Sequence, residues 1–146
     1  MLTNYSAPLL LFAALLLPST CYGDDARALQ GVWKPISAEM GGHALPEAAV
    51  KAITLRIKKG GYEVTVAGEP GVDQGTTMLD TRSRPKRMTI TGVKGPNAGK
   101  VFPAIYELKG KRLRICYNLK GTERPSAFKT AAGSMLFLAT YLRTKP

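Results

Sequence analysis

Cysteine, histidine and acidic residues are scarce in this chain of 146 residues. Two cysteines are too few for a disulfide-stapled miniprotein, and a single histidine excludes most metal cages and histidine-based relays. Ten acidic residues stand against 21 Lys and Arg, which gives a formal net charge of +11. An apolar fraction of 45% excludes a disordered chain and is enough for a core. The length allows one domain.

Long apolar runs are also missing. The longest run, Leu9 to Leu17, is too short to cross a membrane as a helix, which needs about 20 residues. Small residues follow it at Cys21 and Gly23, as they do in a secretory signal that is cleaved after Gly23, although no Lys or Arg precedes the run. We therefore predict a signal peptide over residues 1–23 and export to the periplasm or the extracellular space. Residues 24–146 then form the mature domain.

Two alternatives to a cleaved signal remain open. In one, Cys21 is the lipidated first residue of a lipoprotein, although Pro18 and Thr20 depart from the residues usual before such a cysteine. In the other, the apolar tail stays on the chain. Cleavage after Gly23 leaves 123 residues with Cys116 as the one cysteine, so the domain must rely on its core for stability.

The mature chain alternates between apolar and polar residues at period two, which is typical of strands. Ile53, Leu55 and Ile57 share one face, and Gly60-Gly61 then supplies a hairpin turn. The strands that this pattern predicts are 29–40, 53–58, 62–66, 74–79, 87–91, 101–108, 112–119, 126–130 and 135–142. Between the first two, Ala44 to Lys51 reads as a short helix with Pro46 in its first turn.

A tight turn at Gly110-Lys111 sets the register of the strands around it. It places three apolar pairs on one face, as an antiparallel ladder requires, namely Leu108–Leu113, Tyr106–Ile115 and Ala104–Tyr117. Eight or nine short antiparallel strands describe a barrel or a sandwich. Because long crossovers are nearly absent, we predict a single all-β, antiparallel up-and-down barrel of 8–9 strands with one short helix in the first connection.

Several segments resemble a known kind of barrel. Gly31-Val32-Trp33 on the first strand and Arg143 after the last resemble the lipocalin-like pattern, in which the Trp closes one barrel end and the Arg packs across its ring. A longer similarity covers LQGVWKPISAEMGGHALPEAAVKAITLRI, GTTMLD, IYELKGKRLRICYNL, ERPSAFKT and LFLATY. These segments resemble an uncharacterised lipocalin-like domain family of exported planctomycete proteins with many paralogues. Pro35 and Thr77 depart from the β-branched apolar residues usual there.

The resemblance implies a lipocalin-like barrel and structural roles for Trp33 and Arg143. It implies no catalytic residue, because the family has no established function. By analogy with lipocalins, the barrel end below the first connection would be open and the opposite end closed.

Basic residues gather at the end that we expect to be closed. Alternate connections of an up-and-down barrel emerge at the same end, so the turns near residues 60, 83 and 110 lie together. The basic residues of this end are Lys58, Lys59, Arg82, Arg84, Lys86, Arg87, Lys109, Lys111 and Arg112. Asp80 is the one acid that these three connections carry, whereas the loops of the other end are nearly neutral.

Two functions follow, and neither is enzymatic. In the first, the barrel holds a small apolar ligand, with a lining predicted to be Tyr62, Val64, Phe102, Tyr106, Ile115 and Tyr117. These residues could equally fill the interior as a packed core. In the second, the basic end docks on an anionic envelope polymer or on lipid head groups. A solvated surface that keeps the protein soluble also explains the charge. Nucleic acid is a disfavoured partner, because no exposed aromatic run accompanies the charge.

The sequence offers few candidate catalytic residues. His43 lies in a Gly-rich connection without a nucleophile beside it, and Glu63 and Glu107 point away from the expected interior. Cys116 shares a strand face with Arg114, so it is either a partly exposed thiol beside cations or a small residue on a half-covered strand. We expect no metal, no cofactor and no catalytic residue.

Overall fold

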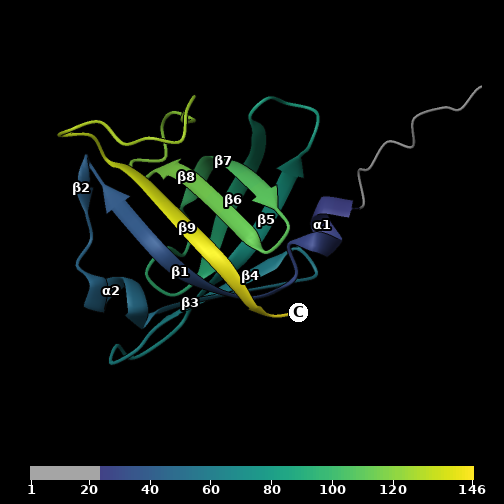
Figure 1. Ribbon diagram of the computed structural model, residues 1–146, viewed down its shortest axis with the longest axis horizontal. Coiled ribbons are helices and arrows are strands. Elements are labelled where there is room, and N and C mark those ends of the chain that lie inside the picture. Colours follow the sequence, from purple (N-terminus) through teal and green to yellow (C-terminus); the bar gives the residue numbers. More distant parts are fainter. Residues whose placement is uncertain (1–23) are drawn as a thin grey trace, which may run out of the picture.

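The computed structural model describes residues 24–146, so the predicted signal peptide over residues 1–23 and the alternative of a lipidated Cys21 lie outside the described residues. Two short helices and nine strands make up the fold (Figure 1). In chain order they are α1 (Asp24–Ala28), β1 (Gly31–Met40), β2 (His43–Ala44), α2 (Glu47–Ala52), β3 (Ile53–Lys58), β4 (Gly61–Val66), β5 (Asp73–Asp80), β6 (Lys86–Lys94), β7 (Val101–Lys109), β8 (Arg112–Asn118) and β9 (Leu136–Lys145).

The strands form one closed antiparallel barrel, which confirms the predicted fold class. Strands β1 and β3 to β9 follow one another around the barrel, and pairing of β1 with β9 closes it. The extra strand, β2, adds two residues beside the end of β1. The register predicted for β7 and β8 is also confirmed, because Leu108 pairs with Leu113 and Tyr106 with Ile115.

Both helices differ from the sequence-based expectation. The predicted helix Ala44–Lys51 begins later, at Glu47, because Ala44 belongs to β2 and Pro46 is the residue before the helix. Helix α1 was not predicted, since its five residues are too few to show a helical period. It lies outside one end of the barrel, at the right of Figure 1, whereas α2 lies at the other end.

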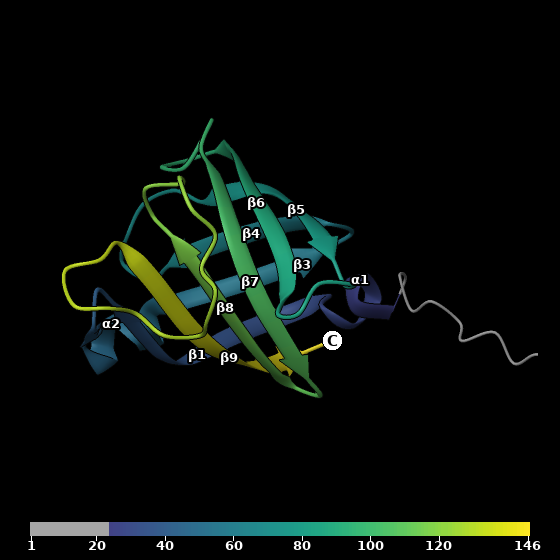
Figure 2. The ribbon, with the colours of Figure 1, turned by 90° about the horizontal axis from the view of Figure 1, so that it is seen from above.

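The predicted strand over residues 126–130 is wrong. Residues 119–135 contain no strand and run as an irregular segment across the outside of β7, β8 and β9 (Figure 2). Arg124 fastens it to the wall, because its Nη1 donates to the carbonyls of Met88 at 2.8 Å and Ala104 at 2.5 Å. Further along, the Thr130 hydroxyl donates to Glu39 Oε1 at 3.0 Å. We call residues 119–135 the outer segment.

The outer segment also excludes one of the two alternatives for Cys116, the partly exposed thiol beside cations. The thiol does lie on the outward face of β8, but its residue is fully buried, and Sγ is 3.9 Å from the Lys129 carbonyl. Burial raises the pKa of Cys116 to about 11, so the thiol stays protonated. Arg114 is stacked on the ring of Phe128 in the outer segment, 4.3 Å from its centroid.

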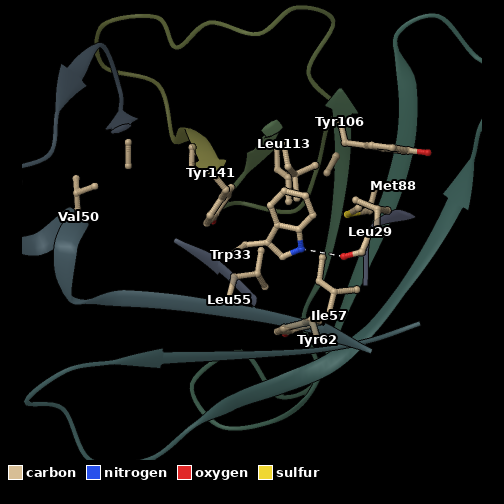
Figure 3. Packing of buried hydrophobic residues seen from close by; sticks show 14 residues of the cluster. Leu29, Trp33, Val50, Leu55, Ile57, Tyr62, Met88, Tyr106, Leu113 and Tyr141 are labelled. Atoms are coloured by element: carbon tan, nitrogen blue, oxygen red, sulfur yellow. Dashed lines mark hydrogen bonds between the residues drawn. The ribbon is translucent and has the colours of Figure 1, made fainter. Parts of the chain in front are cut away.

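One barrel end is closed by a Trp-centred cluster. The Trp33 ring is fully buried, and its Nε1 donates to the carbonyl of Leu29, just after α1, at 2.8 Å (Figure 3). On its other side, Cζ of Arg143 lies 4.8 Å from the ring centroid, and the Arg143 guanidinium donates to the Ala28 carbonyl. The structure thus places Arg143 inside β9, directly opposite Trp33 in the ladder. We call this end the closed end and the opposite end the mouth.

Candidate ligand-binding site at the mouth

The closed end carries the basic residues singled out in the sequence. Eight of the nine are exposed, and Lys86 is the partly buried exception. Asp80, however, is not the one acid there: α1 brings Asp24 and Asp25 to the same end. The sequence argument missed them because it counted the connections between strands and left out the residues before β1.

Asp25 is held at the closed end by partners from the chain itself. Its Oδ2 accepts hydrogen bonds from Lys86 Nζ and from the Tyr106 hydroxyl, both at 2.7 Å. Burial alone would raise the pKa of Asp25, but the bonds from Lys86 and Tyr106 outweigh it, so the pKa lies below its usual value. Burial and the nearby carboxylate raise the pKa of Tyr106, which keeps the phenol neutral. The three side chains form a closed Tyr–Asp–ammonium triad.

A small cavity opens inside the barrel toward the mouth. Its volume is about 60 Å³, which at about 10–15 Å³ for each water-sized site is room for roughly four to six non-hydrogen atoms. Drug-sized ligands occupy about 300–1,000 Å³. The interior is therefore largely filled by its own side chains. The residues that line the remaining space are Leu55, Ile57, Tyr62, Val64, Asp73, Thr77, Met88, Ile90, Asn97, Phe102, Ile115, Tyr117 and Tyr141.

The predicted lining residues divide between the cavity and the closed end. The five that line the cavity are Tyr62, Val64, Phe102, Ile115 and Tyr117. The sixth, Tyr106, is fully buried, and its hydroxyl points away from Trp33 (Figure 3) to reach Asp25. Tyr106 is thus part of the closed-end triad and does not line the cavity.

A carboxylate at the start of β5 defines the polar side of the cavity. Asp73 Oδ2 accepts hydrogen bonds from the Tyr62 hydroxyl at 3.2 Å and from Asn97 Nδ2 at 2.9 Å. Its Oδ1 accepts one from the backbone N–H of Asn97 at 3.1 Å. Within residues 24–146, no Lys or Arg forms an ion pair with Asp73. This carboxylate has neutral donors but no cation.

Two glycines permit this arrangement. Gly75 lies opposite Tyr62 in the ladder, and a Cβ there would meet the Tyr62 ring at 2.6 Å and the Thr91 carbonyl oxygen at 1.9 Å. A Cβ at Gly92 would lie 1.8 Å from the carbonyl oxygen of Asn97. Glycine at both positions lets the link after β6 fold close enough to place Asn97 against Asp73.

Two tyrosine hydroxyls in the cavity have no hydrogen-bond partner among the described residues. Tyr141 is 7% exposed and lines the cavity from β9, and Tyr117 lines it from β8. Burial raises the pKa of Tyr117 to about 12, with a further contribution from Asp73. Burial, and then Tyr117, raise the pKa of Tyr141 as well. Both phenols are therefore neutral, and Tyr117 lies near both Asp73 and Tyr141.

Two aromatic rings pack against the ring of Tyr117. The Tyr117 centroid is 5.5 Å from that of Phe102 and 5.4 Å from that of Phe137, with tilted planes in both pairs. The cavity therefore combines an aromatic and aliphatic wall, one carboxylate and two unpartnered hydroxyls.

The sequence argument missed Asp73, Asn97 and Tyr141. Asp73 is the first residue of β5 and Asn97 lies in the link after β6, and a polar residue is ordinary at both positions. Tyr141 lies in a run that is apolar on both faces, because the outer segment covers part of the outward face of β9. One usable signal was the pair Gly75 and Gly92 within strands, which marks a close approach of backbone.

Other chemistry is not indicated within residues 24–146. His43 is exposed in β2, and no group of three or more His, Cys, Asp or Glu residues there could hold a metal ion. Among the same residues, no helix has the length and apolar character that a membrane crossing requires. Comparison of the chain with family models, with curated proteins and with solved structures gave no match.

Proposed function

We propose that this chain is a non-enzymatic binding barrel that holds a small ligand in the mouth cavity. The observation that carries the proposal is the pair of cavity-lining hydroxyls on Tyr117 and Tyr141, which have no hydrogen-bond partner among the described residues, beside the Asp73 carboxylate. Because neither hydroxyl makes an internal hydrogen bond, a molecule that supplies partners here gains affinity without displacing one. The lipocalin-like barrel, the resemblance to exported planctomycete proteins and export itself belong to the same proposal.

The size of the cavity limits the ligand. A molecule of more than about six non-hydrogen atoms cannot lie wholly inside the 60 Å³ available. A larger ligand would have to leave part of itself in the mouth. The small apolar ligand expected from the sequence thus becomes a small ligand with at least one polar group.

A cavity-filling variant tests this function. Ile90 lines the cavity from β6, so Ile90→Phe should fill it and abolish binding of small molecules detected by NMR shift perturbation. Val93→Phe is the matched control, because Val93 lies on the same strand but is 66% exposed. If small polar molecules bind neither the wild-type protein nor the control, or bind Ile90→Phe equally well, the proposed function is wrong.

The closed end supports a second candidate function, docking on an anionic polymer or on lipid head groups. It is favoured by the eight exposed basic residues that gather at this end of the barrel. Charge reversal at Lys58, Lys59 and Arg87 should abolish retention on heparin-like beads or anionic vesicles at low salt, whereas reversal at Lys94 and Lys100 near the mouth should not. Lys86 is spared, because its reversal would break the ion pair with Asp25. Equal retention of both variants would exclude this candidate.

A further inference from the structure

The two ends of the barrel contain the same pair of groups, and this likeness points to the ligand. At the closed end, Asp25 accepts from a tyrosine hydroxyl and from the ammonium of Lys86. At the mouth, Asp73 also accepts from a tyrosine hydroxyl, that of Tyr62, but its other donors are the neutral amides of Asn97. The mouth therefore has the Tyr–Asp pair without the ammonium.

We propose that the mouth cavity binds a primary alkylammonium group, whose NH3⁺ donates to Asp73 and to the hydroxyl oxygens of Tyr117 and Tyr141. The proposal rests on the proposed function and adds the chemical class of its ligand. A primary ammonium has three N–H donors and no acceptor, which matches one carboxylate oxygen and two hydroxyl oxygens.

The hydrogen bonds already made by Asp73 leave room for this donor. Oδ1 accepts a single bond, from the backbone N–H of Asn97, while Oδ2 accepts two. A carboxylate offers about four acceptor sites. An anionic ligand, by contrast, would face the charge of Asp73 and gain only two hydroxyl donors.

The wall of the cavity suits the rest of such a molecule. Tyr117 and Phe102 present aromatic rings, which attract a cation at their faces, and Leu55, Ile90 and Ile115 offer apolar surface to an alkyl chain. With room for roughly four to six non-hydrogen atoms, the cavity fits a chain of three to five carbons. n-Butylammonium is therefore the probe of choice.

The charge of the protein helps to separate specific from general binding. With a net charge of +11, the surface repels cations. A cation that binds in a one-to-one ratio must therefore find a local site, and Asp73 is the lining carboxylate of this cavity.

The test is calorimetric titration of the purified protein with n-butylammonium, butan-1-ol and butyrate. We expect n-butylammonium to bind at about millimolar concentration or below, at least about tenfold more tightly than either of the others, because a hydrogen bond between charged groups is about twice as strong as a neutral one. Equal binding of butan-1-ol would overturn the proposal that the ligand is an ammonium, while leaving the proposed function intact. Absence of binding by all three would overturn both.

Variants locate the binding. Asp73→Asn should weaken n-butylammonium binding about tenfold or more, and Asp80→Asn, which changes a partly exposed carboxylate at the closed end, should leave it unchanged. Tyr117→Phe keeps the fold and removes one acceptor, so a loss of a few-fold is expected even if Asp73→Asn is poorly folded. Unchanged binding by Tyr117→Phe and by a folded Asp73→Asn would contradict the site.

A primary ammonium can come from a free amine or from a lysine side chain of another protein. Nα-acetyl-lysine amide carries the same four-carbon ammonium chain on a peptide backbone. Tighter binding of this probe assigns the source to a lysine, and tighter binding of n-butylammonium assigns it to a free amine. Both results support the ammonium site, and failure of both probes overturns it.

Discussion

The closed end and the mouth contain similar residues, but these residues differ in whether they have hydrogen-bond and ion-pair partners within the chain. At the closed end, Trp33 and Asp25 find all their partners within the chain, because α1 and Leu29 fold across the opening. At the mouth, Tyr117 and Tyr141 keep hydroxyls without partners among residues 24–146, and Asp73 has no cation there. From this difference we propose that the closed end contributes stability and that the mouth binds a ligand.

The largest expected effect concerns the core of the closed end. Trp33→Ala should lower the free energy of unfolding by about 3–5 kcal/mol, because it leaves a cavity and removes the ring under Arg143. Denaturant unfolding measures the loss, with Ile36→Ala on the same strand as the control, since Ile36 is 52% exposed. A loss below about 1 kcal/mol would show that this end does not stabilise the barrel.

The two carboxylates should differ in what they contribute to stability. Asp25→Asn should cost about 1–2 kcal/mol at neutral pH, because it removes a charged acceptor from Lys86 and Tyr106. Asp73→Asn should cost less than Asp25→Asn, because it breaks no ion pair and keeps an oxygen for the Asn97 N–H. Equal losses would break the comparison between the ends.

The effect of Asp25 should depend on pH in a defined direction. Its folded pKa lies below the unfolded value of 3.8, so the native state holds the carboxylate charged more firmly than the unfolded state. The stabilisation is fully present above the unfolded pKa and is lost as the pH falls through the folded pKa. The difference between wild type and Asp25→Asn, measured by urea unfolding, should therefore be constant near neutrality and shrink in acid. A difference that grows in acid would contradict the triad.

A smaller contrast is expected between the two hydrogen-bonded phenols. Tyr106→Phe should cost about 1–2 kcal/mol, because its hydroxyl makes a 2.7 Å bond to a partly buried carboxylate. Tyr62→Phe should cost about 0.5–1 kcal/mol, because its bond to Asp73 is longer, at 3.2 Å. Thermal unfolding of both variants decides the order, and the reverse order would count against a more tightly bonded closed end.

The smallest effects should come from the unpartnered hydroxyls. Tyr117→Phe and Tyr141→Phe should change the unfolding free energy of the ligand-free protein by no more than about 0.5 kcal/mol, because neither removes an internal hydrogen bond. Chemical denaturation without ligand measures this. A loss above about 1 kcal/mol in either variant would show that the hydroxyl already has a partner, which would remove the support for a ligand.

Much of the barrel could be predicted from alternation and turns. The register around Gly110 follows from the apolar pairs beside it. The segment from Ile53 to Ile57 was predicted as a strand because its apolar and polar residues alternate between two faces. The outer segment could not be predicted, because Arg124 binds carbonyls of β6 and β7, and such long-range bonds leave no periodic trace. It also explains the full burial of Cys116, for which the outward strand position left both a partly exposed thiol and a half-covered small residue open.

The candidate site was only partly visible in the sequence for a related reason. Tyr62 and Tyr117 lie on inward faces of regular strands, so alternation found them. Asp73 and Asn97 meet because the link after β6 folds back onto the start of β5, where Gly75 and Gly92 allow the close approach, and alternation within a strand does not reveal such a tertiary contact. Tyr106 was assigned to the lining because its strand face is inward, but that face extends to the closed end, where α1 supplies Asp25.

The most direct test of the proposed ammonium site compares two thermal unfolding midpoints of the protein. One is measured with n-butylammonium and the other with butan-1-ol at the same concentration. At about ten times its dissociation constant, a ligand that binds only the folded state adds roughly 1.4 kcal/mol of stability, which raises the midpoint by several degrees. We expect this rise when n-butylammonium is added to the wild-type protein. We expect no such rise when butan-1-ol is added to the wild-type protein or when n-butylammonium is added to Asp73→Asn. Equal midpoints with both probes, or the same rise for Asp73→Asn, would contradict the account.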